Sequence, residues 1–286
     1  MVQQSKSLVV CADDFGIHPS VSNAIVRLID ARRISATSVL VLGEDSERSA
    51  PRLAERRSEC SVGLHFSLTE ASGWRRWVPL PVLITSASLR LLNPESVRER
   101  IRRQLDRFEE FFGTAPDFLD GHEHVHQLPA IREIVLDHLC DRYGTAVAVR
   151  STHAVVARGP KALLVAAFGS KVLSRTASER GLTVNSDFAG AYSFERVGQY
   201  RTRITGWLDS MSDGGLIMCH PGTDPHADSI SMARYEEYSY LRSREWPEDL
   251  ATHAVHLRPF QGLRRPPASS PDAAPARRSS ESQTAP

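Results

Sequence analysis

Short apolar runs alternate along the chain with segments in which apolar residues recur every three or four positions. The first run covers residues 7–13, and Val21, Ala24, Ile25 and Leu28 have helical spacing in the segment that follows. The pattern predicts strands over 7–13, 36–42, 61–68, 117–125, 145–151, 182–188 and 214–220. It predicts helices over 20–32, 45–57, 95–112, 129–143, 160–180 and 195–211, with one or two more between 230 and 255.

Strands that alternate with helices indicate βαβ units and a parallel sheet. Several runs are apolar throughout, as expected of strands that are covered on both faces. About seven units favour a closed or nearly closed (β/α) barrel, although an open doubly wound sheet gives the same alternation. We expect one domain over 1–262. The segment 263–286 is rich in Pro, Ala, Ser and Arg, which predicts a disordered tail.

Composition and charge exclude several classes of protein. The 286 residues include 35 Lys and Arg and 34 Asp and Glu, giving a net charge of +1, and 41% of them are hydrophobic. This balance argues against a nucleic-acid partner and against intrinsic disorder. No apolar run approaches the roughly 20 residues of a membrane span, and no secretion signal is evident. The four cysteines are scattered, as is typical of reduced thiols, so we expect a cytoplasmic protein.

Polar residues follow the predicted strands at the positions where those strands end. Asp13 and Asp14 close the first strand, His65 lies near the end of the third, and His220 ends the last clear one. Because the carboxyl ends of parallel strands share one rim, these side chains are expected to be neighbours. Taken singly, each has a plainer interpretation: a solvated turn for the Asp pair and for His220, and a packed core residue for His65. Together they indicate a cation ligand beside a general base, with His220 as a general acid or oxyanion stabiliser.

The segment 120-DGHEHVH-126 is the strongest local signal. In a strand, His122, His124 and His126 would point to the same side, and imidazole is a common metal ligand. Asp120 could orient one of the imidazoles; a solvated histidine-rich loop is the plainer alternative. The segment also matches HExxH, but Gly121 and the nearby proline oppose the helix that this motif needs. A metalloprotease is therefore a distant alternative.

Four motifs in this order, CADDFG, GLHFSL, DGHEHVHQLP and MCHPG, resemble the YdjC-like carbohydrate deacetylases. That family includes chitooligosaccharide deacetylases and hopanoid-biosynthesis-associated proteins, and the resemblance runs from about residue 7 to about 255. Cys11 stands where the family typically has Asn. The resemblance implies a distorted (β/α) TIM-like barrel of the glycoside hydrolase/deacetylase type.

The resemblance also implies the roles of the site residues. It assigns Asp14, His65 and His122 to one divalent metal ion and Asp13 to the general base, and His220 is the general-acid candidate. His124 and His126 have no assigned role beyond substrate contact or support of a ligand. The donor set favours zinc or a similar transition metal, such as Fe²⁺, whereas the family is commonly described with magnesium. The implied reaction is hydrolysis of an N-acetyl group on an amino sugar, which releases acetate.

Two further functions use the same residues differently: a non-catalytic barrel that binds a glycan or lipid head group, and a non-haem iron oxygenase. The substrate-binding residues are unassigned. Trp74 and Trp77 could stack on sugar rings or pack on the barrel, and Arg75, Arg76 and Arg150 could favour an anionic sugar. Chitobiose-like, nucleotide-linked and lipid-linked substrates stay open, as does the oligomeric state, a homodimer included.

Overall fold

The computed structural model describes residues 5–69, 78–195 and 197–263, along which strands and helices alternate. The strands are β1 (Lys6–Phe15), β2 (Ala36–Val39), β3 (Ser61–Phe66), β4 (Phe118–Gly121), β5 (Ala148–Val149), β6 (Phe188–Ala189), β7 (Leu216–Cys219) and β8 (Val255–Leu257). The helices are α1 (Pro19–Asp30), α2 (Ser46–Ala54), α3 (Leu80–Ser88), α4 (Pro94–Phe112), α5 (Ile131–Tyr143), α6 (Pro160–Ala166), α7 (Ser170–Glu179), α8 (Tyr200–Ser210), α9 (Ser231–Arg242) and α10 (Glu245–Thr252). Short 3-10 helices, η2 (His122–Gln127) and η3 (Phe260–Leu263), follow β4 and β8.

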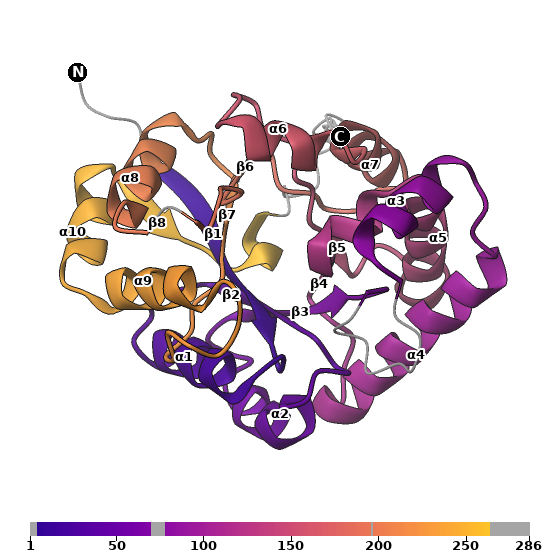
Figure 1. The fold of residues 1–286 in the computed structure, drawn as a ribbon, viewed down its shortest axis with the longest axis horizontal. Helices are drawn as coiled ribbons and strands as arrows, with labels where there is room; N and C mark the ends of the chain where they lie inside the picture. The colour runs from indigo at the N-terminus through magenta and orange to yellow at the C-terminus, as the bar shows by residue number, and fades with distance from the viewer. Residues whose placement is uncertain (1–4, 70–77, 196, 264–286) are drawn as a thin grey trace, which may run out of the picture.

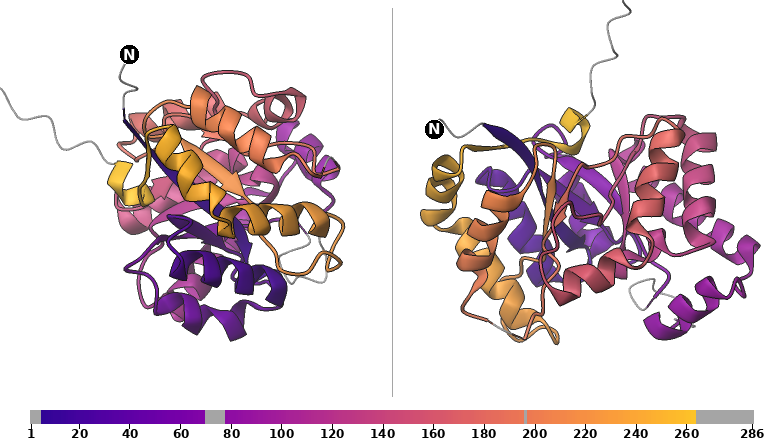
Figure 2. Two further views of the ribbon diagram at one scale, coloured as in Figure 1. Left: turned by 90° about the vertical axis from the view of Figure 1, so that its left-hand side faces the viewer. Right: turned by 90° about the horizontal axis from the view of Figure 1, so that it is seen from above.

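The strands form one sheet in the order β5–β4–β3–β2–β1–β7–β6, and β8 pairs with the first residues of β1. All these pairs are parallel. Parallel neighbours need crossover connections, which the helices supply. The strands gather at the centre, with α1 and α2 below them, α4 and α5 on the right and α8, α9 and α10 on the left (Figure 1). Seen from above, the helices again lie around the outside of the sheet (Figure 2).

The sheet is curled, and one short segment joins its two ends. Val149 of β5 forms a parallel bridge with Val184, and a few residues later β6 pairs with β7. The amide of Val149 donates to the carbonyl oxygen of Thr183 at 2.9 Å. The expected (β/α) barrel is therefore confirmed, and it is distorted because β5 and β6 have only two residues each.

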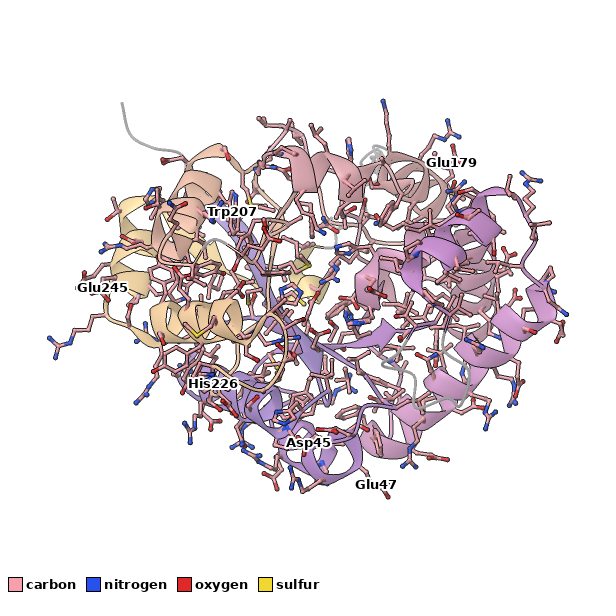
Figure 3. All side chains as sticks on the ribbon, in the orientation of Figure 1. Asp45, Glu47, Glu179, Trp207, His226 and Glu245 are labelled. Carbon is pink, nitrogen blue, oxygen red and sulfur yellow. The ribbon has the colours of Figure 1, made fainter. Side chains whose placement is uncertain are left out.

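Alternation along the strands separates an inner from an outer layer. In β1, Val9 and Cys11 belong to the inner apolar cluster, whereas Leu8, Val10 and Ala12 belong to the cluster that includes the helices. Side chains fill both layers (Figure 3). The inner cluster also includes Ala36, Phe118, Ala148, Phe188, Leu216, Met218 and Phe260. One step closer to the carboxyl ends, the same inward phase carries polar residues: Asp13, Ser38, His65, Asp120, Arg150 and His220.

Several elements differ from the sequence-based expectation. The strand predicted over 182–188 is reduced to a bridge at Val184 and the first residue of β6, and β8 was not expected. The helix predicted over 160–180 is broken between α6 and α7, where Gly169 has a φ of +106°; a Cβ there would lie 2.8 Å from the carbonyl oxygen of Gln127. The run 117–125 stays extended only to Gly121. Helix α3 was not expected, because its sequence LPVLITSAS has neither helical spacing nor a charged face.

Other expectations lie partly or wholly outside the described residues. The predicted tail beyond Leu263 and the segment with Trp74, Arg75, Arg76 and Trp77 are among these. Within the described part of the chain, no helix combines the length and apolar character that a bilayer crossing needs. The four cysteines are free thiols, of which Cys11, Cys60 and Cys219 are buried.

A substitution at Gly63 of β3 tests how tightly the inner apolar cluster is packed. A Cβ at this position would lie 2.5 Å from the Phe118 ring, which stacks on Phe260 with 4.8 Å between ring centroids. Gly63→Ala should therefore lower the free energy of unfolding by about 1–3 kcal/mol. Gly206→Ala in α8 is the matched control, because a Cβ there meets nothing within 4 Å and alanine favours a helix. Urea unfolding of both variants checks this; equal effects would contradict the packing.

Candidate active site

A cavity of about 770 Å³ opens at the carboxyl ends of the strands. Its lining includes all five site residues that the sequence predicts: Asp13, Asp14, His65, His122 and His220. They come from β1, β3, the start of η2 and the residue after β7. Segments up to 207 residues apart in the chain thus meet at one rim, as the strand-end pattern predicted.

Asp14, His65 and His122 form a compact group of metal-type donors. Their ligand atoms lie within 4.8 Å of one another. Asp14 Oδ1 is 3.0 Å from His122 Nδ1 and 3.3 Å from His65 Nε2. The two imidazole rings meet edge-on, with centroids 5.4 Å apart. Two nitrogens and one oxygen in this arrangement match the protein ligands of a catalytic metal site.

The backbone turns sharply to bring Asp14 into this group. Asp14 has a φ of +69°, a left-handed conformation that is uncommon outside glycine. Its second oxygen, Oδ2, accepts a hydrogen bond of 2.8 Å from Arg234 Nη2 on α9. Burial alone would raise the pKa of Asp14, but Arg234 and His122 hold it well below its usual range. The carboxylate is therefore ionised, and Oδ1 is left to face the histidines.

His65 is oriented by a buried carboxylate. Its Nδ1 lies 2.6 Å from Asp120 Oδ1 and 3.0 Å from Ser38 Oγ, so Nε2 points to Asp14. A carboxylate behind a ligand imidazole fixes the ring and raises its basicity. Burial lowers the pKa of His65, but Asp120 opposes it and raises the pKa to about 10. The role suggested for Asp120 from the sequence thus agrees with its contacts.

Asp13 is held apart from this group by a different partner. Arg150 Nη1 donates to Asp13 Oδ1 at 2.6 Å and lies 3.0 Å from Asp120 Oδ2. Burial raises the pKa of Asp13, but the Arg150 guanidinium outweighs it and keeps the pKa far below its usual range. Arg150 is fully buried, so the suggestion that it faces an anionic sugar is not supported by its position.

His220 lines the same cavity as the metal-type donors. Its Nε2 is 4.0 Å from Asp13 Oδ2, and its Nδ1 is buried without a hydrogen-bond partner among the described residues. Burial lowers the pKa of His220 to about 4, although Asp14 and Asp13 oppose this shift. The resting imidazole is therefore neutral near pH 7.

The buried carboxylate of Glu237 holds the backbone of His220 in place. Glu237 of α9 accepts hydrogen bonds from the His220 amide and, at 2.6 Å, from the Tyr192 hydroxyl. Burial raises the pKa of Glu237 to about 7, against the effect of these two donors. Phe194 packs edge-on against the His220 ring, with centroids 5.2 Å apart.

The expectation that three histidines point the same way was wrong. β4 ends at Gly121, and η2 contains two consecutive left-handed residues, Glu123 (φ +52°) and His124 (φ +60°). Alternation therefore does not continue, and His126 turns inward, where its Nε2 donates to the carbonyl oxygen of Arg150 at 2.8 Å. Because His122 and His126 do not converge, the HExxH interpretation has no geometric basis.

The balance of buried charges favours a cation beside the histidines. Asp13, Asp14 and Asp120 are at most 2% exposed, and they face two buried guanidinium groups, Arg150 and Arg234. One negative charge is thus left over, and without a cation a proton on His65 balances it. A second donor group, Cys11 with Asp13 and Asp120, already has Arg150 as its counter-ion.

Several residues of the site were missed in the sequence. Arg150 was considered only as a contact for an anionic sugar, although it lies near the end of the strand run 145–151, as His65 lies near the end of its own run. The strand-end pattern could therefore have revealed its role. Arg234 and Glu237 lie on α9 and belong to no motif. Ser38 continues the inward phase of β2 but is too common a residue type to stand out.

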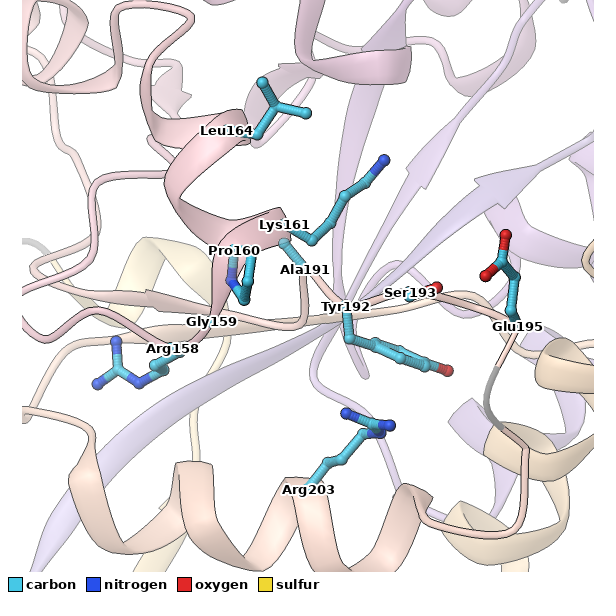
Figure 4. Close-up of a pocket in the computed structure, with 10 residues that line it drawn as sticks. All are labelled: Arg158, Gly159, Pro160, Lys161, Leu164, Ala191, Tyr192, Ser193, Glu195 and Arg203. Carbon is cyan, nitrogen blue, oxygen red and sulfur yellow. The ribbon is translucent and has the colours of Figure 1, made fainter.

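A second cavity of about 510 Å³ adjoins the first. The two share Lys161, Leu164, Ala191 and Tyr192. Arg203 extends from α8 toward the Tyr192 ring, with its guanidinium carbon 5.1 Å from the ring centroid (Figure 4). The active-site cavity therefore adjoins, past Tyr192, a space that Arg158, Glu195 and Arg203 line.

Comparison with known proteins decides the family. The model of the YdjC-like protein family matches residues 7–252. The chain belongs to this family. A mouse carbohydrate deacetylase is 35% identical over 249 residues, covering 79% of this chain and 71% of the mouse protein. A human carbohydrate deacetylase is 32% identical and covers 80% and 69%. A chitooligosaccharide deacetylase of Proteus mirabilis is 32% identical over 46% of this chain and 54% of its own length.

Solved structures confirm the fold. A crystal structure of a protein from Enterococcus faecalis V583 superimposes with a TM-score of 0.68 at 20% identity and covers 91% of this chain and 99% of that one. The Bc1960 peptidoglycan N-acetylglucosamine deacetylase gives a TM-score of 0.50 at 13% identity, with coverage of 91% and 89%. The match to the family model over residues 7–252 confirms the resemblance drawn from the four motifs. The enzyme class that the resemblance implied, a carbohydrate N-deacetylase, agrees with the names of the mouse and human relatives.

Arg150→Met tests whether one guanidinium holds the buried carboxylates. The variant leaves Asp13 and Asp120 buried without their counter-ion, so the free energy of unfolding should fall by about 3–5 kcal/mol. Arg98→Met is the control, because the Arg98–Glu95 pair is exposed and such pairs contribute at most about 1 kcal/mol. Denaturant unfolding at pH 7 measures both; a small loss in Arg150→Met would refute the role.

Glu237 predicts a pH dependence of stability. Its pKa rises from the ordinary 4.5 to about 7 on folding, so the folded state binds a proton that the unfolded state releases. The stability that Glu237 contributes should therefore be complete below about pH 4.5 and should be lost as the pH rises to about 7. Glu237→Gln cannot titrate, so unfolding curves across pH 4–8 should show the wild type losing stability relative to this variant between about pH 4.5 and about 7. An unchanged profile would mean that Glu237 is not the group responsible.

Proposed function

We propose that the protein hydrolyses the N-acetyl group of an amino sugar, or of a sugar conjugate, to acetate and a free amine. The observation that carries the proposal is the separation of two functions within one cavity. Asp14, His65 and His122 offer metal-type donors, while Asp13 and His220 stand beside them with different partners. Relatives named carbohydrate deacetylase and chitooligosaccharide deacetylase support the sugar as substrate.

The donor chemistry fits a single divalent cation. Asp14, His65 and His122 would hold it, with Asp120 fixing His65 and Arg234 fixing Asp14. Two imidazoles and one carboxylate favour zinc or a similar transition metal over Mg²⁺, which prefers oxygen ligands. Such a cation supplies Lewis acidity, which lowers the pKa of water and polarises an amide carbonyl.

The chain's own residues handle the protons. Asp13 is the general base: Arg150 keeps its carboxylate ionised and fixes Oδ1, so Oδ2 is the oxygen that accepts a proton from water. His220 is neutral in the resting site and acts as a general acid only after it receives a proton. Asp13 Oδ2, 4.0 Å from His220 Nε2, is the neighbour from which that proton would come. His220 would then protonate the departing amine.

Asp13→Asn tests the assignment of the base. The variant should retain the metal, because the three donors are untouched, but acetate release should fall by roughly 10²–10⁴-fold. The assay strips the protein with a chelator, restores Zn²⁺, Mg²⁺, Mn²⁺, Co²⁺ or, without air, Fe²⁺, and measures acetate from a panel of N-acetylated mono- and oligosaccharides. Asp137→Asn on α5, an exposed site, is the matched control.

Each other outcome points to a different function. Oxygen-dependent turnover with Fe²⁺ and no acetate would favour an oxygenase. Metal binding without turnover of any sugar, including nucleotide- and lipid-linked ones, would favour a binding barrel. Near-normal acetate release by Asp13→Asn would contradict the role of Asp13.

A further inference from the structure

His124 is a cavity residue to which the proposed reaction gives no role. Its ring lines the cavity and meets the Phe188 ring edge-on, with centroids 6.2 Å apart. The histidines on either side have structural explanations: His122 contacts Asp14, and His126 contacts the Arg150 carbonyl oxygen. His124 has no such contact.

The backbone conformation shows that the position of His124 is imposed. Glu123 and His124 are both left-handed, and two such residues in succession are costly without glycine. Strain of this kind persists where the surrounding fold enforces it, and it concentrates at functional sites. Here the turn lets His122 reach Asp14 and also places the His124 ring in the cavity.

The two ring nitrogens of His124 are in different surroundings. Nδ1 is buried and has no hydrogen-bond partner, and neither nitrogen is paired with another described residue. A buried ring N–H that has no acceptor costs more free energy than a buried, unprotonated ring nitrogen. The proton of the neutral ring therefore belongs on Nε2, which is not among the buried unpaired atoms. His124 thus offers the cavity a hydrogen-bond donor.

The buried carboxylates on β1 and β4 already have partners within the protein. Asp13 and Asp120 share the Arg150 guanidinium, and Asp120 also holds His65. His124 thus offers a donor without a partner among the described residues, in the cavity that the proposed base also lines. We propose that His124 is a substrate-binding residue that donates a hydrogen bond from Nε2 to an oxygen of the substrate. This inference rests on the proposed deacetylation.

Two substitutions of His124 distinguish a contact with the substrate from a structural role. The side-chain amide nitrogen of Gln reaches about as far as Nε2, whereas that of Asn reaches only as far as Nδ1. Asn, however, tolerates a left-handed backbone better than Gln does. A structural role therefore predicts that His124→Asn is the milder change, and the proposed contact predicts the opposite.

The experiment measures kcat and KM for acetate release, zinc content and Tm for both variants. His256→Asn, at the exposed position of β8, is the control. We expect His124→Asn to lower kcat/KM by about 10–100-fold at full zinc content, and His124→Gln to stay within about 5-fold of the wild type. Wild-type kinetics in His124→Asn, or a greater loss in His124→Gln, would overturn the contact.

A second readout does not depend on turnover. Long-range ¹H–¹⁵N spectra of the zinc-loaded protein, compared with those of His124→Asn, report which nitrogen of His124 carries the proton, and acetate serves as the probe ligand. We expect the Nε2–H form and a shift of that signal with acetate. An Nδ1–H form, or no response to acetate, would refute the inference, whereas absent turnover of every sugar would refute the proposed function instead.

Discussion

The guanidinium of Arg150 makes it feasible to bury two carboxylates at the centre of the barrel. Asp13 and Asp120 both contact it, and all three side chains are shielded from water. Because Asp13 has this partner, it stays ionised without joining the metal-type donors; because Asp120 has it, Asp120 can also orient His65. Asp13 is thus separated from the metal-type donors, although it is adjacent to Asp14 in sequence, by its contact with Arg150 together with the left-handed backbone of Asp14.

Much of this arrangement was predictable because parallel strands obey a simple alternation. Cys11, Asp13, His65 and Asp120 all lie on the inward phase of their strands, and the apolar runs locate those strands. The motifs therefore led to the barrel and to the family. Arg150 obeys the same rule, but a single arginine after a strand is ordinarily solvated, so the alternation alone did not single it out.

The remaining features depend on backbone turns and distant packing, which no short pattern encodes. Asp14 is out of phase with Asp13 and joins the ligand group only through its left-handed backbone. Glu123 and His124 end the alternation after β4 in the same way, so the three histidine side chains do not point to the same side as expected. Arg234 comes from α9, 220 residues after Asp14 in the chain. Its contact requires the folded barrel.

The central claim is that Asp14, His65 and His122 hold the catalytic metal. An anomalous difference map from a crystal of the zinc-loaded protein tests it most directly. The account predicts one strong peak within zinc–ligand distance of these three residues, with zinc–nitrogen distances of about 2.0–2.1 Å. A peak at Cys11, Asp13 and Asp120, with the Arg150 side chain displaced, would contradict it.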